Sequence, residues 1–469
     1  MNTPLRTTVA RALFALALAT AAHAAPIAFV VESDFSTGSF SRYDGATGVA
    51  SCDRAPAHSD ARVRTYGGQV FVVNRFGADN ITVLDGGTSA FVRQFSVGNG
   101  ANPYDIAFAS GTQAYVTRYE SSALWVVNPS TGAQTGTVSL AALADADGIP
   151  EMDRAIVVGP LLFVSLQRVD RTNGFQPTDT SLVAVVDTRT NTLVDCDAAR
   201  PGVQGIVLPR TNPVTPFVLD VARSRLYLGC VGSYGVADGG VVAIDPVTLT
   251  AAGVVAPESA LGGDVLDLAW GGDDRAFAIV ADGSFNTALV RWSRTTGAAV
   301  QTLYAPGGFS LADAELTPDG SEVWVCNSSF GSPGVRRFAA TTGAATGSVL
   351  ACTLPPQGIA FPSGRRSTFR RSPPVGAWRC RPRCPTRPVA RCACRSRWRP
   401  VRGRGASRCS TSPGAWCGRG RPVRARPGPR SNGTSPMPRG GAWPPACTGC
   451  ACGWVPSRSR VRYWCSSEQ

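Results

Sequence analysis

The sequence predicts an all-β fold, a seven-bladed β-propeller, from a recurring turn motif and a constant order of strands around it. Each copy of the motif ends an apolar alternating run, usually with Asp or Asn, and after two further residues has a threonine, often followed by glycine. An Asp or Asn side chain caps such a turn, and glycine supplies the positive φ that reverses the strand. A strand-and-turn repeat of roughly 40 to 60 residues is typical of a propeller. The seven copies lie at 44–48, 85–89, 128–132, 187–191, 245–249, 293–297 and 339–343.

Each repeat has four predicted strands in a fixed order, which is the content of one blade. In the repeat at 104–140, an inner strand at 104–108 precedes strands at 114–118 and 123–127, and a weaker fourth strand follows the turn at 134–140. Apolar and polar residues alternate in these segments, and sustained helical spacing is confined to the amino-terminal signal region.

The inner strands predict how the ring closes. Six of them lie at 60–63, 105–108, 153–157, 220–222, 267–270 and 313–316. A seventh lies late, at 357–361, whereas the first strand of the chain, 27–31, has the composition of a second strand and no inner partner. We therefore expect 357–361 to complete the blade begun at 27–31, because an open array would leave an unpaired strand edge at each end.

The amino terminus predicts export. Arg6 and Arg11 precede an apolar run at 12–22 that ends in a small-residue cleavage site, Ala22-His23-Ala24. The run is shorter than a bilayer span, so residues 1–24 are interpreted as a removed secretory signal, with no transmembrane span afterwards. We expect a secreted, periplasmic or cell-surface protein whose propeller covers 25–363.

Composition changes abruptly after Ser363. Residues 1–363 have 22 Arg and 31 acidic residues, whereas 364–469 has 24 Arg and one acidic residue, Glu468, so the net charge of +14 belongs to the tail. The tail also has ten of the fifteen Cys, with no alternation and no zinc-type pairing. We predict a tail of low order and no nucleic-acid partner. A hypothesis is that a frameshift replaced an immunoglobulin-like carboxy-terminal domain, since the chain has no Lys, as in GC-rich coding.

Scarce histidine and cysteine limit the chemistry of the propeller. His58 is the only histidine left after signal removal, which argues against a copper or haem enzyme and against a Ser-His-Asp arrangement. Five cysteines precede the tail, and an exported protein can form disulfides. Since Cys52 and Cys352 fall in the neighbouring first and last blades, we predict that they pair.

An aspartate recurs at the inner strands, and these strands line the axis of a propeller. The six residues are predicted to form a ring at one mouth of the channel: Asp60, Asp105, Asp153, Asp220, Asp267 and Asp313. Such a ring repels itself unless it is compensated. One interpretation is a site for Ca²⁺, another hard cation or a cationic ligand, and the other is that each Asp caps its own loop.

Long loops are predicted on the same rim, at 143–152, 167–180, 197–216 and 232–239. Function concentrates in long loops on a rigid scaffold. Two loops of the fourth blade contribute charged or polar candidates: Asp145, Asp147, Glu151, Gln167, Arg168, Asp170 and Arg171. The first loop is either a truncated calcium loop or a solvated acidic loop.

Runs at 113–117 (QAYVT), 69–73 (QVFVV) and 245–248 (DPVT) resemble the YVTN-type seven-bladed propellers of secreted and surface-layer bacterial proteins. The resemblance covers 27 to about 363. It implies the fold and leaves several functions open, since such propellers serve as binding scaffolds, lactonases and cofactor enzymes. Where the family often has Pro-x-Gly-Ile-Ala, six inner strands have Asp in place of that Gly, and only Gly358 keeps it.

Two functions are therefore carried forward. As a monomeric binding scaffold, the protein presents its loop face to an extracytoplasmic protein, a glycan or a small ligand. As a Ca²⁺-dependent lactonase-like hydrolase, it uses channel carboxylates to hold the metal and polarise an ester. Related lactonases combine Glu and Asn ligands, whereas this predicted ring is made of Asp.

Overall fold

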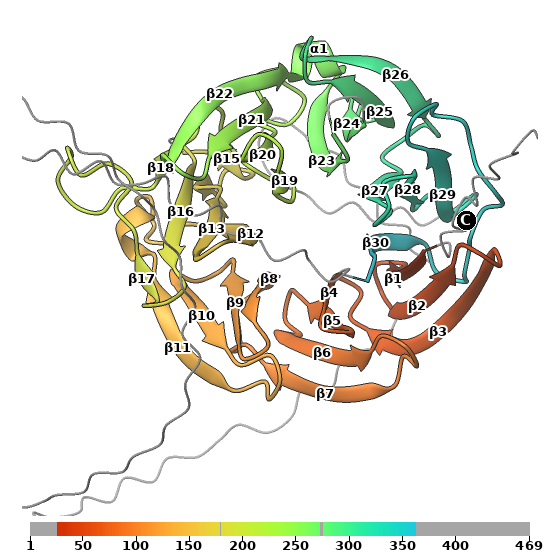
Figure 1. Cartoon of the computed structure of the whole chain (residues 1–469), viewed down its shortest axis with the longest axis horizontal. Coiled ribbons are helices and arrows are strands. Elements are labelled where there is room, and N and C mark those ends of the chain that lie inside the picture. Colours follow the sequence, from red (N-terminus) through yellow and green to blue (C-terminus); the bar gives the residue numbers. More distant parts are fainter. Residues whose placement is uncertain (1–25, 179, 273–274, 363–469) are drawn as a thin grey trace, which may run out of the picture. The chain divides into compact units, whose positions relative to one another are not determined.

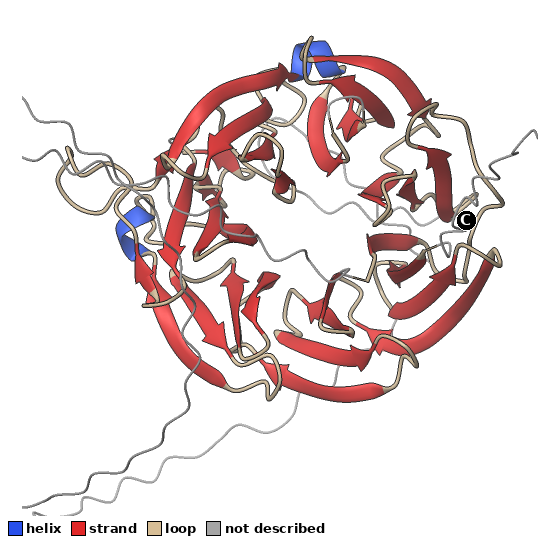
Figure 2. Cartoon of the chain, viewed as in Figure 1, coloured by secondary structure: helices blue, strands red, loops and turns tan. Residues whose placement is uncertain are grey.

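The computed structural model describes residues 26–178, 180–272 and 275–362, which form a ring of seven β-sheets (Figure 1). Strands make up nearly all of its regular structure (Figure 2), with one 3₁₀ turn, η1 (Ala141–Leu143), and one short helix, α1 (Glu258–Leu261). The predicted signal at 1–24 and the predicted tail at 364–469 lie outside the described residues. The seven-bladed propeller is confirmed.

The first three blades each contain four antiparallel strands, ordered from the axis outward. Blade 1 has β30 (Pro356–Ala360), β1 (Ile27–Ser33), β2 (Gly38–Asp44) and β3 (Val49–Ala57). Blade 2 has β4 (Ala61–Tyr66), β5 (Gln69–Asn74), β6 (Asn80–Asp85) and β7 (Phe91–Ser96). Blade 3 has β8 (Pro103–Ser110), β9 (Gln113–Arg118), β10 (Ala123–Val127) and β11 (Gln134–Ser139).

Blade 4 differs from the first three by an insertion and a divided outer edge. Its main strands are β12 (Met152–Val158), β13 (Leu161–Leu166) and β16 (Leu182–Asp187). Two short strands share the outer edge, β17 (Thr192–Leu193) and β18 (Ile206–Val207). A two-stranded hairpin, β14 (Val169–Asp170) and β15 (Gln176–Pro177), projects from the connection between β13 and β16.

The last three blades return to the simpler pattern. Blade 5 has β19 (Val218–Asp220), β20 (Arg225–Cys230), β21 (Gly240–Asp245) and β22 (Thr250–Pro257). Blade 6 has β23 (Asp264–Trp270), β24 (Ala276–Ala281), β25 (Thr287–Ser293) and β26 (Ala298–Tyr304). Blade 7 has β27 (Leu311–Leu316), β28 (Glu322–Asn327) and β29 (Gly334–Ala339).

The prediction of four strands in every blade is wrong for blade 7. Only two isolated bridges, Val335 to Leu350 and Phe338 to Ala345, stand where a fourth strand would pair. The physical reason is that the chain after β29 leaves blade 7 and runs to blade 1. There the Cys52–Cys352 disulfide holds it.

The recurring turn has the geometry that its residues predict. In the first copy, Oδ1 of Asp44 accepts hydrogen bonds from the backbone N–H groups of Ala46 and Thr47, at 2.9 and 3.1 Å. The last residue of all seven copies has a positive φ, between 56° and 80°, even where it is Ser89, Asn191 or Leu249. Hence the turn geometry persists in copies that lack glycine.

The core lies between blades, since alternate residues of one strand face opposite neighbours. Ile106 of β8 packs into the cluster shared with blade 2, and the adjacent Ala107 packs into the cluster shared with blade 4. Trp292 and Trp324 are the largest side chains buried this way. Among the described residues, no helix is long and apolar enough to cross a membrane.

The ring closes between the two ends of the propeller, as predicted. β30 pairs antiparallel with β1, with Ala360 opposite Phe29 and Ile359 opposite Val30. Cys52 of β3 forms the predicted disulfide with Cys352, across 300 residues of sequence. Closure therefore combines backbone hydrogen bonds near the axis with a covalent bond at the outer edge.

Replacing both members of this disulfide, Cys52→Ser with Cys352→Ser, should lower the free energy of unfolding by about 2–5 kcal/mol, because the unfolded chain regains freedom. Urea unfolding without reductant measures the loss. Cys196→Ser is the matched control, because Cys196 forms no disulfide within the described residues. Equal loss in control and double variant would contradict a closing role for the disulfide.

Candidate functional site

One face of the propeller gathers two kinds of connection, and we call it the loop face. In blades 2, 3 and 4, the loop after the second strand bonds to the segment that enters the inner strand of the same blade. Backbone N–H groups of Arg75, Tyr119 and Gln167 donate to carbonyls of Asp60, Asn102 and Glu151, at 2.9–3.1 Å. The predicted shared rim is therefore present, and it surrounds the starts of the inner strands.

Three of the six predicted aspartates occupy equivalent places, and each carboxylate reaches the next blade. Oδ2 of Asp105 accepts the backbone N–H of Ala155 at 3.1 Å. Asp267 accepts from Ala314 at 2.7 Å, and Asp313 accepts from Ile359 at 2.9 Å. These carboxylates join the inner strands of neighbouring blades, which differs from the predicted capping of their own loops. Oδ1 of Asp105 also accepts the N–H of Ile106 in its own strand, at 2.9 Å.

Asp60 lies outside the equivalent position. It precedes β4, its side chain is 43% exposed, and Oδ1 is 3.2 Å from Arg75. Arg62 takes the equivalent place, because it pairs with Val73, the fifth residue of its second strand, as Asp105 pairs with Thr117. The predicted carboxylate is thus replaced by an arginine in blade 2.

Asp153 is also displaced, by one residue. The pairing of β12 with β13 shifts between Met152 and Ala155, which puts Arg154 in the place of Asp105. Asp153 is buried, and its Oδ1 lies 3.3 Å from Nε of Arg154. Blades 2 and 4 therefore both point an arginine where the sequence predicts an aspartate.

Asp220 lies at the opposite end of its strand. It pairs with Arg225 beside the β19–β20 turn, and its carboxylate accepts from the backbone and side chain of Arg223. The start of the inner strand in blade 5 has Thr215 and Pro216 instead, and the Thr215 hydroxyl accepts the N–H of Gly229 at 2.8 Å. The prediction of a ring of six carboxylates is therefore wrong, because only three of the six aspartates occupy equivalent places.

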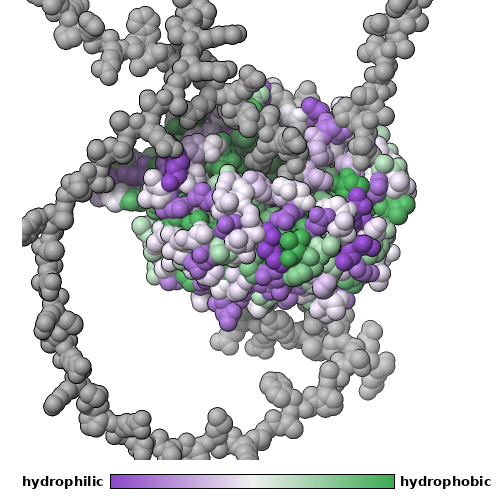
Figure 3. Space-filling view, turned by 60° about the horizontal axis from the view of Figure 1, so that its bottom comes forward, coloured by the Kyte–Doolittle hydropathy of each residue, from purple (hydrophilic) through white to green (hydrophobic). Residues whose placement is uncertain are grey.

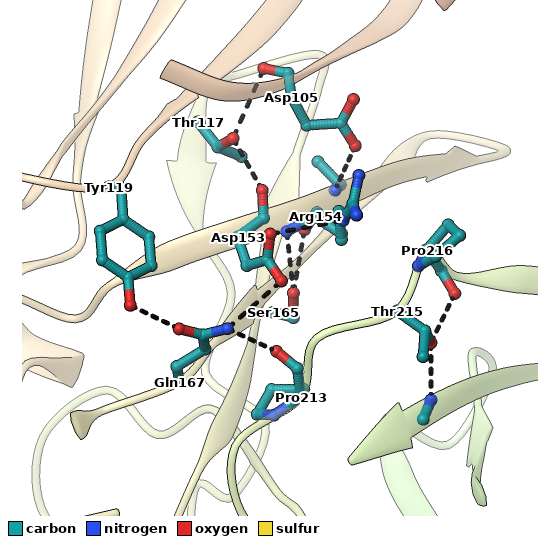
Figure 4. Close-up of polar contacts among 12 residues, drawn as sticks. Asp105, Thr117, Tyr119, Asp153, Arg154, Ser165, Gln167, Pro213, Thr215 and Pro216 are labelled. Atoms are coloured by element: carbon teal, nitrogen blue, oxygen red, sulfur yellow. Dashed lines mark hydrogen bonds and ion pairs between the residues drawn. The ribbon is translucent and has the colours of Figure 1, made fainter. Parts of the chain in front are cut away.

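A polar network connects blades 3, 4 and 5 near the axis (Figure 4). The Tyr119 hydroxyl donates to Oε1 of Gln167 at 2.6 Å, and Nε2 of Gln167 donates to the carbonyl of Pro213 at 3.1 Å. The same Nε2 is 3.4 Å from Oδ2 of Asp153. Gln167, predicted in the loop 167–180, therefore lies at the centre of the loop face.

Burial shapes the ionisation of this network. It raises the pKa of the Asp153 carboxyl, against the attraction of Arg154, Arg62 and Arg75. Burial, and then the nearby positive charge of Arg62, lowers the pKa of Arg154 to about 10. Both shifts follow from burial, since Asp153 is 1% and Arg154 is 7% exposed.

The other side of the axis is acidic. Burial, and then the adjacent carboxylate of Asp313, raises the pKa of Asp267 well above its ordinary value. Burial and Asp313 also raise the pKa of Glu315 to about 7. At the other end of the inner strands, a cavity of about 470 Å³ is bordered by four blades, with Glu315, Arg275 and Trp270 among its lining residues.

The charged loops of blade 4 fold onto one another. Arg171 forms ion pairs with Glu120, with Asp147 at 3.6 Å and with Glu151 at 3.4 Å. Asp145 accepts the hydroxyl of Thr178 at 2.6 Å. The carboxylates of the predicted acidic loop are therefore engaged by an arginine and a hydroxyl.

Arg168 and Asp170 organise the hairpin itself. Arg168 donates to the carbonyl of Thr180 at 2.6 Å. Asp170 caps its own turn by accepting the N–H groups of Thr172 and Asn173. Among the described residues, no group of three His, Cys, Asp or Glu side chains is arranged to hold a metal ion.

An aromatic series on the loop face was missed by the sequence analysis. The connection between the second and third main strands of every blade carries one aromatic residue. The seven, in chain order, are Phe35, Phe76, Tyr119, Phe175, Tyr234, Phe285 and Phe330. We call them the aromatic collar. Placing the repeats in register and comparing these connections would have revealed it.

Most of the collar is presented to solvent. The exposed fractions are 71% for Phe35, 73% for Phe76 and 70% for Phe330, and Phe175 and Tyr234 are 44% and 45% exposed. Elsewhere, on the side of the propeller in Figure 3, apolar residues form separate small patches among polar ones.

Four of the collar phenylalanines have a backbone that bulky side chains rarely adopt. Phe35, Phe76, Phe175 and Phe285 have φ between 43° and 68°. A left-handed conformation costs a non-glycine residue about 1–2 kcal/mol. The loops therefore hold these rings in position against a local preference, which is common at functional sites.

These features define a seven-bladed β-propeller whose loop face combines an aromatic collar with arginines and carboxylates at the axis. No protein-family model and no curated protein sequence matches the chain.

Solved structures share its fold at low identity. A putative 6-phosphogluconolactonase from Bacteroides uniformis is 13% identical, with a TM-score of 0.51, over 72% of this chain and 100% of that chain. A second, from Bacteroides fragilis, is 13% identical, with a TM-score of 0.49, over 73% and 99%. Kuenenia stuttgartiensis hydrazine synthase is 15% identical, with a TM-score of 0.38, over 52% of this chain and 64% of that chain. These likenesses extend to the fold alone.

Asp105→Asn should destabilise the propeller by about 1–3 kcal/mol, because Arg64, whose Nε lies 2.7 Å from Asp105, loses a buried partner. Asp60→Asn is the matched control, and its exposed pair with Arg75 should cost less than about 1 kcal/mol. Urea unfolding compares the two. A loss for Asp60→Asn as large as that for Asp105→Asn would contradict the inter-blade role.

Glu151→Gln should change how stability depends on pH. Burial raises the pKa of Glu151 to about 8, although Arg171 lies nearby. Between the ordinary carboxyl pKa and 8, the unfolded chain has released this proton and the folded chain keeps it, so stability falls as pH rises. The difference between the Tm of the wild type and the Tm of the variant should therefore be smaller at pH 8 than at pH 5, by about 2 °C or more.

Thermal unfolding followed by circular dichroism measures this difference. Asp170→Asn is the control, because hydrogen bonds lower the pKa of Asp170 and leave it ionised across the whole range. The same Tm difference for Glu151→Gln at pH 5 and pH 8 would disprove the assignment.

Proposed function

We propose that the protein is a binding scaffold that recognises its ligand through the loop face. The single observation that carries the proposal is the aromatic collar, with one aromatic residue in the corresponding connection of all seven blades. Exposed aromatic side chains lose favourable contact with other apolar groups, and their large, rigid rings contribute strongly to binding. Their gathering on one face supports an interaction surface there.

The strained loop backbone supports the same proposal. A phenylalanine that is more than 70% exposed, as Phe35 and Phe76 are, gains little packing energy within the propeller. Its left-handed conformation is nevertheless unfavourable for a bulky side chain. A ligand that covers the ring would supply the compensating contact.

We further propose that the protein works outside the cytoplasm, as a YVTN-type propeller of secreted proteins. The Cys52–Cys352 disulfide supports an oxidising compartment, where such bonds form and persist. The signal-like residues 1–24 agree with this location. A glycan or an extracytoplasmic protein is the expected ligand.

The contacts at the axis favour this scaffold over a lactonase-like hydrolase. Asp105, Asp267 and Asp313 accept backbone N–H groups of neighbouring blades. One oxygen of each carboxylate is thus engaged in joining two blades, and among the described residues no three His, Cys, Asp or Glu side chains are arranged to hold a metal ion.

The double variant Phe35→Gly with Phe76→Gly tests the collar. Binding of the full chain is measured on glycan and peptide arrays, and we expect the signals seen for the wild type to fall about tenfold or more. The Tm should stay equal or rise, because glycine adopts the left-handed backbone without strain.

Phe91→Ala is the matched control, since Phe91 is 67% exposed but lies on the outer strand β7. It should bind as the wild type does. Wild-type binding that survives loss of Phe35 and Phe76 would contradict the proposal. Absence of array binding together with Ca²⁺-dependent lactone hydrolysis would replace it by the hydrolase.

A further inference from the structure

Four arginines converge on the axis inside the aromatic collar. Arg62 and Arg64 come from β4, Arg75 from the loop after β5, and Arg154 from β12. Burial, and then the positive charge of Arg75, lowers the pKa of Arg62, and Arg62 in turn lowers that of Arg154. These guanidinium groups therefore lie close enough to repel one another.

The local carboxylates leave one arginine without an ion-pair partner of its own, although the charge of Asp153 acts on it. Arg64 pairs with Asp105 at 2.7 Å, Arg75 with Asp60 at 3.2 Å, and Arg154 with Asp153 at 3.3 Å. Within residues 26–178, 180–272 and 275–362, Arg62 forms no ion pair. Arg62 is half-buried, and its Nε atom is fully buried. A guanidinium withdrawn from water in this way is unfavourable unless a charge compensates it.

Hydrogen-bond donors are also left over. The Nε atoms of Arg62, Arg75 and Arg154 are buried, and none makes a hydrogen bond to the described residues. Arg154 is only 7% exposed as a whole. Buried polar atoms are nearly always bonded, so three such donors in one cluster indicate that a group with acceptor atoms belongs there.

Aromatic rings fix the orientation of the cluster. The guanidinium carbon of Arg75 lies 3.6 Å from the ring centre of Tyr104, and that of Arg62 lies 5.4 Å from it. Tyr104 stacks on Tyr119 at 4.4 Å, and Tyr119 is held by its hydrogen bond to Gln167. The arginines are thus set in place before any ligand arrives, which reduces the entropy lost on binding.

We propose that Arg62, Arg75 and Arg154 form an anion site at the axis of the loop face, which takes the carboxylate or phosphate group of a small ligand. A planar guanidinium matches both kinds of oxyanion through paired N–H donors. The partly neutralising aspartates keep the apo cluster stable and leave about one positive charge for the ligand. The site uses none of the exposed collar phenylalanines. The anion-site proposal can therefore be tested independently of the scaffold proposal.

Isothermal titration of the full chain with inorganic phosphate in one arm, and with citrate in the other, tests the site. We expect saturable binding in at least one arm, weakened roughly ten- to hundredfold by Arg62→Gln. Arg62→Lys should bind with intermediate affinity, because lysine keeps the charge and loses the paired donors. The arm with tighter binding identifies the anion class.

Arg189→Gln is the matched control: it removes the same charge from a side chain that is 69% exposed on the β16–β17 turn. It should bind as the wild type does, and so should Phe35→Gly with Phe76→Gly. The Tm of Arg62→Gln in anion-free buffer should not be lower than that of the wild type, because the repulsion between Arg62 and Arg75 is removed. Unsaturable binding in both arms, or equal weakening by Arg189→Gln, would overturn the site.

Discussion

The pairing of β30 with β1 is the constraint on which the rest of the structure depends. Without it, blade 1 would lack its inner strand and expose a row of backbone donors and acceptors at the axis. The pairing also positions Ile359, whose N–H donates to the Asp313 carboxylate of blade 7. The same closing strand therefore completes both a sheet and the series of carboxylate bonds between blades.

Much of this architecture could be predicted from sequence because it rests on local chemistry. The Asp44 turn needs only a capping side chain and a positive φ, both of which are set by residues that are adjacent in the chain. The Cys52–Cys352 pair followed from closure, because closure puts the first and last blades side by side. The turn could be predicted without any knowledge of the fold, and the disulfide required only that the two ends of the ring meet.

The axis was harder to predict because one residue of register changes which side chain points inward. Asp153 and Arg154 are neighbours in sequence, and a local irregularity in the pairing of β12 decides that Arg154 takes the equivalent place. Asp220 ends a short inner strand that starts late, so an apparent match in sequence lies at the opposite end of the blade. The aromatic collar was harder to see for another reason. Phe35, Phe76, Tyr119 and Phe330 each lie nine residues before the first residue of the turn motif, but loops of other lengths place Phe175, Tyr234 and Phe285 twelve, eleven and eight residues before it.

The loop face combines exposed aromatic side chains with buried charged side chains. Exposed rings on strained loops favour contact with a partner at little benefit to the fold, whereas the buried arginines and aspartates beneath them must balance charge within the protein. The exposed phenylalanines of the collar can therefore change with little effect on the inter-blade bonds, whereas Tyr119 is buried and bonds to Gln167 of the next blade. Blade 4 carries both, since its hairpin presents Phe175 while β12 supplies Arg154.

Closure by the last strand also governs how the protein is made. A ribosome delivers β1 early and β30 only after every other blade has emerged, so blade 1 waits with an open edge for nearly the whole of synthesis. Such long-range contacts form slowly, and an unpaired edge is prone to capture by another chain. The sheet of blade 1 therefore stays incomplete until residue 360 is available.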